Sequence, residues 1–316
     1  MRPNHQTTDK KRGISMETKI GIIGLGTMGM GIAENLLKRG YVVQGFDLLP
    51  ERMQLLEQKG GTAAPSPAQA ADGASALILM VFNGEQVQDV LFGQDGAANV
   101  LPKGGSVLVT ASVGYAACEE AEKGLEPLGL HLVDCPVRGT AATSASGELY
   151  LMVGASPEAF SKNQELLNQL GSTVIHVGDK PGMGQKAKTC MQAFFSLMFE
   201  GTCELLALGT ASGLDPRTVF EVLDGTSASN GIFRATAKHV AGRVFTGTGN
   251  PLSILDKDMQ IACASASAFG LSLPALEGIS SNFRESMKQC GKEDIWSVVK
   301  TLEQPAGLEI QFDFPE

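Results

Sequence analysis

The sequence predicts an α/β protein, in which an N-terminal Rossmann domain with a doubly wound parallel sheet is followed by an all-α C-terminal domain. Three observations support this fold class. A glycine-rich turn joins an apolar run to a helical pattern at 19–40, short apolar runs then alternate with helical patterns up to residue 178, and only helical patterns follow. Repeated βα units are typical of a parallel doubly wound sheet.

The length of 316 residues fits two domains. The β patterns end before Asp179-Lys180-Pro181-Gly182, so we place the boundary there. This gives an NAD-binding domain over 16–180 and an all-helical substrate and oligomerisation domain over 181–310. Residues 1–15 are polar and rich in turn formers, and we expect a disordered extension there.

Composition and charge exclude several classes of protein. The net charge is −9, and no block of Lys and Arg follows the first dozen residues, so nucleic acid is not an expected partner. No apolar run approaches the ~18 residues that cross a bilayer, and the start lacks the apolar core of a secretory signal, so we expect a cytoplasmic protein without a membrane segment. The 6 cysteines occur singly and the 4 histidines are not at ligand spacing, so no metal site is expected.

The first motif is KIGIIGLGTMGMGIAENLLKRG, which begins at Lys19. Gly24 would form the tight turn, Gly26 would let the backbone approach a pyrophosphate, and Gly29 would let helix and strand pack closely. The N-terminus of the helix adds free N–H groups and a positive dipole end. The residues predicted to bind the cofactor here are Gly24, Leu25, Gly26, Thr27, Met28 and Gly29.

A second apolar run, YVVQGF, ends at Asp47, which follows Gly24 by 23 residues. An acidic residue at this place accepts hydrogen bonds from the ribose hydroxyls and repels a 2′-phosphate, so NAD is favoured over NADP. The alternative is that Asp47 caps a helix beginning near Pro50.

Three later apolar runs continue the alternation of strands and helices. Ligands of a doubly wound sheet bind at the carboxyl ends of its strands. Val81, Phe82, Ser112 and the residues after Asp134 should therefore lie along the same edge as the glycine turn. The strands are predicted at 76–82, 106–112 and 130–137.

The second half of the chain begins with a long helix, predicted from Gly184 to about Ser212. Its first turns carry GMGQKAKTCMQ at 182–192. Lys188 and Gln192 are four residues apart and share one face, whereas Lys186 points about 200° away from Lys188. From the pattern alone, Lys188 is either a catalytic group or an ordinary solvated lysine. Later helices are predicted to begin near Pro216, Pro251 and Pro274.

The chain resembles the β-hydroxyacid dehydrogenases, the family of 3-hydroxyisobutyrate dehydrogenase, tartronate semialdehyde reductase and L-threonate dehydrogenase. The resemblance runs from about Lys19 to about Leu302. It is carried by four motifs in order, whose joint spacing is more specific than any one of them. They are GLGTMGMGIAENLLKRG at 24–40, DCPVRGTAATSASGELYLMVG at 134–154, GMGQKAKTCMQ at 182–192 and LDKDMQIA at 255–262.

This resemblance implies roles for single residues. Lys188 matches the catalytic lysine of the family, and Lys257 matches a lysine that reaches the cofactor. Val81 and Phe82 stand where the family has a cofactor-lining Leu-Pro, and Ser112 stands where it has a Thr beside the nicotinamide. The family also implies a homodimer or homotetramer formed through the helical domain.

Two departures from the family pattern concern the substrate, which the resemblance implies is a small carboxylate. Arg138, Gly139 and Thr140 stand where the family usually has Ser-Gly-Gly holding the substrate carboxylate. Either the Arg138 guanidinium binds that anion, or its side chain points away and the next two residues serve. Gln192 replaces the commoner Asn, a change found in the L-threonate and sugar-acid branch.

The predicted reaction is hydride transfer between NAD and a small hydroxy acid, with Lys188 as general acid and base. A lysine can accept the hydroxyl proton if burial lowers its pKa from the usual ~10.4. One alternative is an imine reductase on the same fold, against which Lys188 argues. Another is a non-catalytic NAD-binding regulatory protein, which the change at Arg138 would permit.

Overall fold

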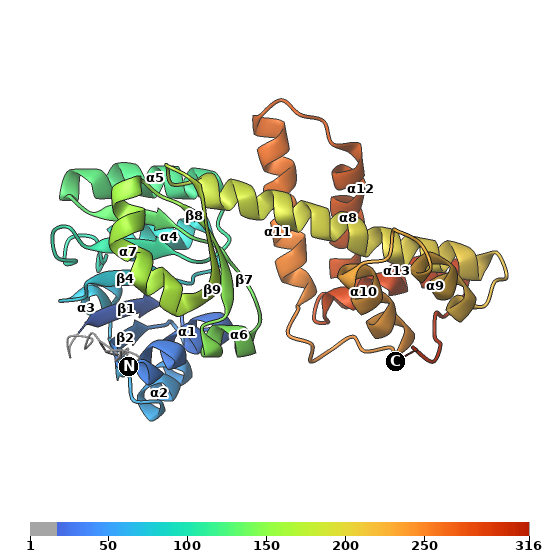
Figure 1. Ribbon diagram of the computed structural model, residues 1–316, viewed down its shortest axis with the longest axis horizontal. Helices are drawn as coiled ribbons and strands as arrows, with labels where there is room; N and C mark the ends of the chain where they lie inside the picture. Colours follow the sequence, from blue (N-terminus) through green and yellow to red (C-terminus); the bar gives the residue numbers. More distant parts are fainter. Residues whose placement is uncertain (1–17, 316) are drawn as a thin grey trace, which may run out of the picture. The chain divides into compact units, whose positions relative to one another are not determined.

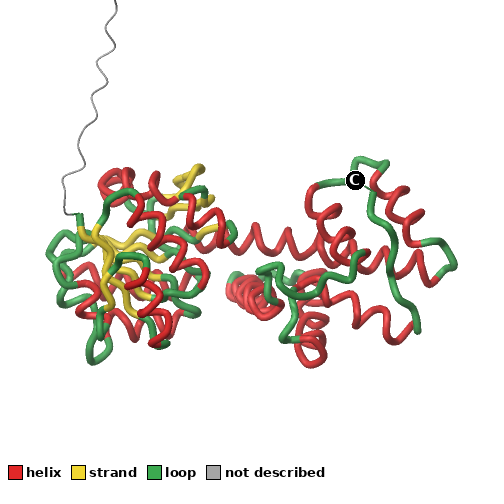
Figure 2. The backbone as a smooth tube through the Cα atoms, turned by 90° about the horizontal axis from the view of Figure 1, so that it is seen from below, coloured by secondary structure: helices red, strands yellow, loops and turns green. Residues whose placement is uncertain are grey.

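The computed structural model describes residues 18–315. The chain divides into two compact units, Met1–Gly184 and Gln185–Glu316. Figure 2 colours the secondary structure and shows that strands occur in the N-terminal unit, while the other unit is built from helices and loops. The division falls four residues after the predicted end of the first domain at 180. The extension predicted at 1–15 lies outside the described residues.

One sheet runs through the N-terminal unit (Figure 1), in the order β3-β2-β1-β4-β5-β6-β8-β7 with β9 beside β8. Adjacent strands from β3 to β6 are parallel, which confirms the predicted doubly wound sheet. The strands are β1 (Lys19–Ile23), β2 (Val42–Phe46), β3 (Thr62–Ala63), β4 (Ala76–Leu79), β5 (Ser106–Val109), β6 (His131–Asp134), β7 (Val137–Arg138), β8 (Leu149–Gly154) and β9 (Gly171–Gly178).

The far edge of the sheet departs from the predicted all-parallel arrangement, because β8 runs antiparallel to both β6 and β7. Only residues 139–148 connect β7 to β8. A parallel crossover needs a dozen or more residues, so this short connection brings the chain back antiparallel. Alternation of apolar runs records the positions of strands but not their directions.

The helices of this unit cover both faces of the sheet, and β4 and β5 are buried at every position. Ile78 packs into one core cluster, whereas its neighbours Leu77 and Leu79 pack into a second one, as the alternation of side chains along a strand requires. The helices are α1 (Thr27–Lys38), α2 (Pro50–Gln58), α3 (Pro67–Ala71), α4 (Gly84–Phe92), α5 (Tyr115–Leu125), the short η1 (Glu126–Leu128), α6 (Ala141–Ser146) and α7 (Pro157–Leu170).

The C-terminal unit is helical, as predicted. Its long first helix, α8, begins two residues before the division between the units. Pro216 and Pro274 begin α9 and α12, and Pro251 is the N-cap of α11. The helices are α8 (Met183–Ala211), α9 (Pro216–Asp224), α10 (Gly231–Ala241), α11 (Leu252–Ala268), α12 (Pro274–Cys290), the short η2 (Ile295–Val298) and α13 (Val299–Ala306).

Aromatic side chains form the centre of the helical unit. The Phe199 ring lies 6.1 Å from that of Phe283 and 5.7 Å from that of Trp296. The chain after α13 also packs into this core, because Ile310 is fully buried and the ring of Phe314 lies 4.9 Å from that of Phe220. The packed unit therefore extends past residue 310, where the predicted domain ends.

Helix α8 corrects the expectation that no segment approaches membrane-spanning length. Among the described residues, Met183–Ala211 is the one helix long and apolar enough to cross a membrane, with a mean hydropathy of 1.2 over 18 residues. The expectation looked for an unbroken apolar run, and polar residues interrupt this one. However, 44% of that window is buried, and Phe199, Cys203 and Leu206 belong to the helical core. A core helix of a globular protein passes the same test.

Candidate functional site

The glycine turn joins the end of β1 to the start of α1. Gly24 has a φ of +92°, and a Cβ there would lie 2.4 Å from the Met80 carbonyl oxygen. A Cβ on Gly29 would lie 1.9 Å from the Gly24 carbonyl oxygen. At Gly26, by contrast, an added Cβ would meet no atom within 4 Å. Gly24 and Gly29 are thus needed for packing, while Gly26 leaves open space where a phosphate group can approach the backbone.

This open space lies at the N-terminus of α1, where Gly26 is the N-cap and supplies no side-chain cap. The N–H groups of a first helical turn lack partners within the helix and suit an anion. The residues present therefore fit the pyrophosphate of a dinucleotide.

Asp47 ties the end of β2 to the glycine turn. Its Oδ2 accepts the N–H of Leu25 at 2.7 Å, and its Oδ1 accepts the N–H of Leu49 at 2.9 Å. The alternative that Asp47 caps the helix near Pro50 is wrong, since the N-cap of α2 is Leu49 and has no side-chain cap. Each carboxylate oxygen has a further lone pair with which to accept a ribose hydroxyl.

Val81, Phe82 and Ser112 follow the carboxyl ends of β4 and β5. Because β1, β4 and β5 are parallel neighbours, with Ile23 beside Leu79 and Leu79 beside Val109, these residues share one edge of the sheet with the glycine turn. The Phe82 side chain is 49% exposed, and its N–H donates to Gln86 Oε1 at 2.8 Å.

The predicted carboxylate-binding segment lies at the end of β7 and the start of α6. Arg138 and Thr140 are both exposed. Thr140 is the N-cap of α6: its hydroxyl accepts the Thr143 N–H at 3.3 Å, and its own N–H donates to Thr143 Oγ1 at 2.7 Å. A Cβ on Gly139 would lie 2.5 Å from the same Oγ1. The cap thus engages the N–H of Thr140 and one lone pair of its hydroxyl oxygen.

In the helical unit, three of the predicted residues converge on a residue that was not predicted, Asp258 of α11. Lys188 is only 8% exposed, whereas Lys186 is half-buried. Gln192 donates its Nε2–H to Asp258 Oδ2 at 2.6 Å, and Lys257 Nζ lies 3.8 Å from Asp258 Oδ1. The positive charge of Lys188 also acts on the Asp258 carboxylate.

Burial governs the electrostatics of this cluster. It raises the pKa of Asp258, against the opposing effects of Lys257, Lys188 and the Gln192 hydrogen bond. It also lowers the pKa of Lys257, against the attraction of Asp258. The charges are therefore weakly screened, and the Lys257 ammonium gives up its proton more readily than that of an exposed lysine.

Asp258 was missed although it stands inside the LDKDMQIA motif. Its sequence signal was its place beside Lys257, a pair that by itself is typical of a solvated surface. The side chains of Lys257 and Asp258 are instead only 19% and 5% exposed.

Glu200 is a second buried carboxyl group that was not predicted. It lies on α8 three turns after Lys188 and is 2% exposed. Asn282 donates its Nδ2–H to Glu200 Oε1, while Glu200 Oε2 is buried and has no hydrogen-bond partner among the described residues. Burial raises the pKa of Glu200 to about 7, and the nearby Glu204 adds to this increase.

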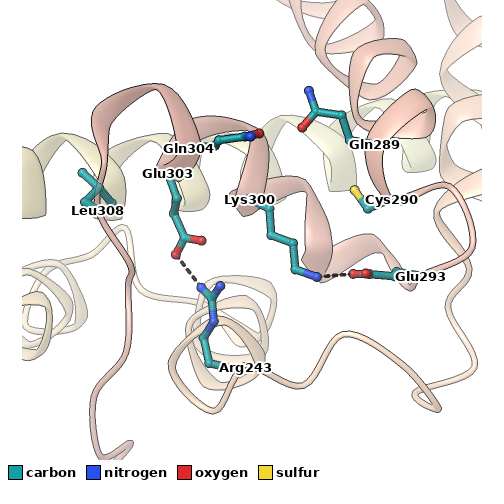
Figure 3. A pocket seen from close by; sticks show the side chains of 8 residues that line it. All are labelled: Arg243, Gln289, Cys290, Glu293, Lys300, Glu303, Gln304 and Leu308. Carbon is teal, nitrogen blue, oxygen red and sulfur yellow. Dashed lines mark hydrogen bonds and ion pairs between the residues drawn. The ribbon is translucent and has the colours of Figure 1, made fainter.

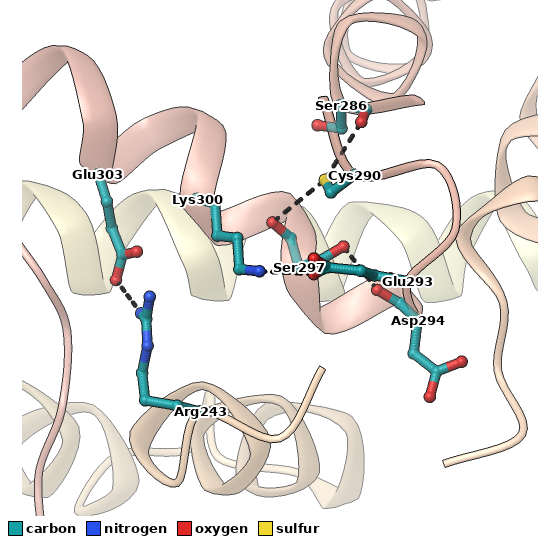
Figure 4. Close-up of polar contacts among 8 residues, drawn as sticks. All are labelled: Arg243, Ser286, Cys290, Glu293, Asp294, Ser297, Lys300 and Glu303. Carbon is teal, nitrogen blue, oxygen red and sulfur yellow. Dashed lines mark hydrogen bonds and ion pairs between the residues drawn. The ribbon is translucent and has the colours of Figure 1, made fainter. Parts of the chain in front are cut away.

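A pocket of about 680 Å³ opens elsewhere in the helical unit (Figure 3). Arg243 pairs there with Glu303, and Lys300 Nζ donates to Glu293 Oε2 at 2.6 Å (Figure 4). Cys290 donates its thiol proton to the Ser286 carbonyl at 3.1 Å. Each cation is already paired with a carboxylate, and none of the predicted site residues lines this pocket.

Family models match both units of the chain. The NAD binding domain of 6-phosphogluconate dehydrogenase matches residues 19–178, and the model described as NAD-binding of NADP-dependent 3-hydroxyisobutyrate dehydrogenase matches residues 182–302. Fold and matches together define a two-domain NAD-dependent dehydrogenase.

Relatives narrow this class. The L-threonate dehydrogenase of Cupriavidus necator is 32% identical over 93% of this chain and 98% of its own length. The NAD-dependent L-serine dehydrogenase of Pseudomonas aeruginosa is 31% identical over 91% and 98%. A crystal structure of 3-hydroxyisobutyrate dehydrogenase from Salmonella typhimurium matches with a TM-score of 0.78 and 30% identity, and the match covers 90% of this chain and 99% of that one. The chain belongs to the β-hydroxyacid dehydrogenase family, as its four motifs predicted.

Proposed function

We propose that this protein transfers a hydride between NAD and a small hydroxy acid, with Lys188 as the general acid and base. The observation that carries the proposal is the cluster at the buried Asp258, which Gln192 and Lys257 contact and on which the charge of the buried Lys188 acts. Bound NAD would supply the hydride acceptor. Family membership supports the oxidoreductase class, and the names of the relatives support a hydroxy acid as substrate.

In the direction of oxidation, Lys188 in its neutral form takes the proton of the substrate hydroxyl. In the reverse direction its ammonium group donates that proton to the carbonyl oxygen. Gln192, one helical turn further along α8, holds a polar group of the substrate. Lys257 contacts the cofactor, and Asp258 balances the charge of the two lysines.

In the N-terminal unit, the turn from Gly24 to Gly29 binds the pyrophosphate and Asp47 binds the adenosine ribose. Val81 and Phe82 line the cofactor and Ser112 lies beside the nicotinamide, roles that the family pattern implies and that the sheet edge shared with the glycine turn supports. These assignments favour NAD because a carboxylate at residue 47 repels a 2′-phosphate.

The segment Arg138-Gly139-Thr140 holds the substrate carboxylate. Within it we assign the main contact to the exposed guanidinium of Arg138, since the N–H of Thr140 is engaged in the cap of α6. A planar guanidinium can bind both oxygens of a carboxylate at once.

The proposal is tested by following NADH formation with a panel of acids that includes L-threonate, D-glycerate, L-serine and 3-hydroxyisobutyrate. Oxidation of at least one acid, with NAD preferred to NADP, is the expected result. Turnover of cyclic amines without turnover of any acid would instead indicate an imine reductase. NAD binding without any turnover would indicate a regulatory protein.

We also propose a homodimer or homotetramer formed through the helical unit, over 181–310. The proposal is supported by large apolar side chains that are more than half exposed and that association could bury. They are Phe194 (61%), Leu208 (66%), Leu214 (53%), Val222 (63%), Phe269 (55%) and Leu271 (56%). Sedimentation of the purified protein tests the oligomeric state.

A cytoplasmic location is also part of the proposal, because all six cysteines are free, as is usual in a reducing compartment.

A further inference from the structure

The hydrogen bond between Gln192 and Asp258 determines which end of the Gln192 amide is available to a substrate. An amide has one accepting oxygen and two donor hydrogens, whereas an ionised carboxylate only accepts. Asp258, which is 5% exposed, therefore takes an N–H of Gln192, and the Nε2 to Oδ2 distance of 2.6 Å fits a charge-assisted bond. The amino side of the amide is thus committed to Asp258.

Burial raises the pKa of Asp258, while two cations and the Gln192 hydrogen bond oppose that rise and favour the ionised, accepting form. Lys257 Nζ lies 3.8 Å from Asp258 Oδ1, and the charge of Lys188 acts on the same carboxylate. Both interactions favour the ionised acid, and so does the N–H that Gln192 donates. A protonated Asp258 would allow the opposite arrangement, in which the amino side of Gln192 is presented.

The carbonyl oxygen of Gln192 is directed away from Asp258, since the oxygen and nitrogen of an amide point in different directions. The side chain is half-buried, and no hydrogen bond to Gln192 Oε1 occurs within residues 18–315. Gln192 also shares a helix face with Lys188, one turn earlier. A molecule whose hydroxyl reaches Lys188 therefore meets an acceptor at Gln192.

We propose that the substrate is a hydroxy acid with a hydrogen-bond donor, either a hydroxyl or an ammonium group, on the carbon next to the reacting one. Asp258 acts as the positioning residue that selects this donor through Gln192. The inference rests on the proposed function. A methyl group in the donor's place would leave the Gln192 carbonyl unpaired, and a site built for a hydrogen bond rejects such an analogue.

Three acids of the form HOCH2–CH(X)–COO⁻ isolate this group. X is ammonium in serine, hydroxyl in glycerate and methyl in 3-hydroxyisobutyrate. We expect kcat/KM for the better of the two donor-bearing acids to exceed that for the methyl acid by roughly 10- to 100-fold, with both enantiomers of each acid assayed. Calorimetric affinities for the same acids in the presence of NAD give a second ratio that does not depend on turnover.

Two variants test whether Gln192 and Asp258 set the preference for a donor-bearing acid, and a third controls for effects on folding. Gln192→Met keeps the length of the side chain and removes the acceptor, so the preference for a donor should fall to within about threefold of unity. Asp258→Asn can offer an N–H to the Gln192 oxygen and let the amide rotate, so the preference should also fall. The matched control is Gln260→Met, because the exposed Gln260 also donates to a carboxylate of α11, Asp256 Oδ2 at 2.7 Å, and the change should leave the ratio unchanged.

The inference is overturned if the native protein binds the methyl acid as tightly as both donor-bearing acids, or if Gln192→Met keeps the native ratio of affinities. The failure of the proposed function looks different. In that case NAD binds and no acid is oxidised, while the calorimetric ratio still decides whether Gln192 selects a donor.

Discussion

In the N-terminal unit the proposed cofactor contacts come from backbone geometry, whereas in the helical unit the proposed chemistry comes from charged side chains removed from water. Gly24 and Gly29 have no room for a Cβ, and Gly26 leaves space in front of the backbone. Lys188, Asp258 and Glu200 have, by contrast, less than a tenth of their surface exposed. Substitutions in the N-terminal unit should therefore affect cofactor binding, whereas those in the helical unit should affect catalysis and the pH dependence of stability.

The largest effect is expected from Lys188→Ala. Removal of the general acid and base should lower kcat by ~10²–10⁴-fold, while the affinity for NAD barely changes because the glycine turn lies in the other unit. Steady-state kinetics and an NAD titration measure the two quantities. Lys186→Ala is the matched control on the same helix and should retain native kcat. Near-native kcat in Lys188→Ala would remove this lysine from the mechanism.

The next largest effect is expected at Glu200 and concerns the stability of the protein. Its native pKa of about 7 lies above the usual 4.5, so between these pH values the native state keeps a proton that the unfolded state has lost. The free energy of unfolding therefore decreases as the pH rises from 4.5. Above pH 7 the total decrease due to Glu200 is about 3 kcal/mol.

Glu200→Gln cannot ionise and keeps an acceptor for Asn282, so its stability relative to the native protein should rise over this pH range. Urea unfolding at pH 5 and pH 8 measures the difference. Glu57→Gln, which alters an exposed carboxyl group of α2 in the N-terminal unit, is the control and should show no such pH dependence. Equal differences at both pH values would mean that Glu200 is already ionised in the native state.

The two units also differ in how far the sequence predicts them. Glycines at fixed spacing report a backbone conformation directly, so the turn at 24–29 and the parallel strands around it could be predicted. The antiparallel β8 could not, because burial patterns carry no direction. Asp258 and Glu200 were missed because a charged residue is assumed to be solvated until the packing around it is known. Family motifs selected Lys188 without showing that it is buried.

A pair of glycine substitutions tests the role of the backbone. Gly26→Ala adds a Cβ in open space, so the free energy of unfolding should change by less than about 1 kcal/mol, while NAD binding weakens tenfold or more. Gly29→Ala places its Cβ against the Gly24 carbonyl and should cost ~1–3 kcal/mol of stability. Denaturant unfolding and NAD titration measure both variants. Equal destabilisation of both would mean that Gly26, too, has only a packing role.

The smallest effect is expected at Asp47, the one place where the N-terminal unit is proposed to use a charged side chain on the cofactor. Asp47→Ser should reduce the preference for NAD over NADP by roughly tenfold, since the repulsion of a 2′-phosphate is lost. Serine also gives up at least one of the bonds to the N–H groups of Leu25 and Leu49. Asp47→Asn is therefore the closer variant in shape, because its one amide oxygen still accepts the N–H of Leu25, while the charge and the bond to the Leu49 N–H are lost. If the ratio of kcat/KM for NAD and NADP changes in Asp47→Ser but not in Asp47→Asn, Asp47 acts only through its hydrogen bonds to the backbone. The N-terminal unit would then bind the cofactor without using any charged side chain.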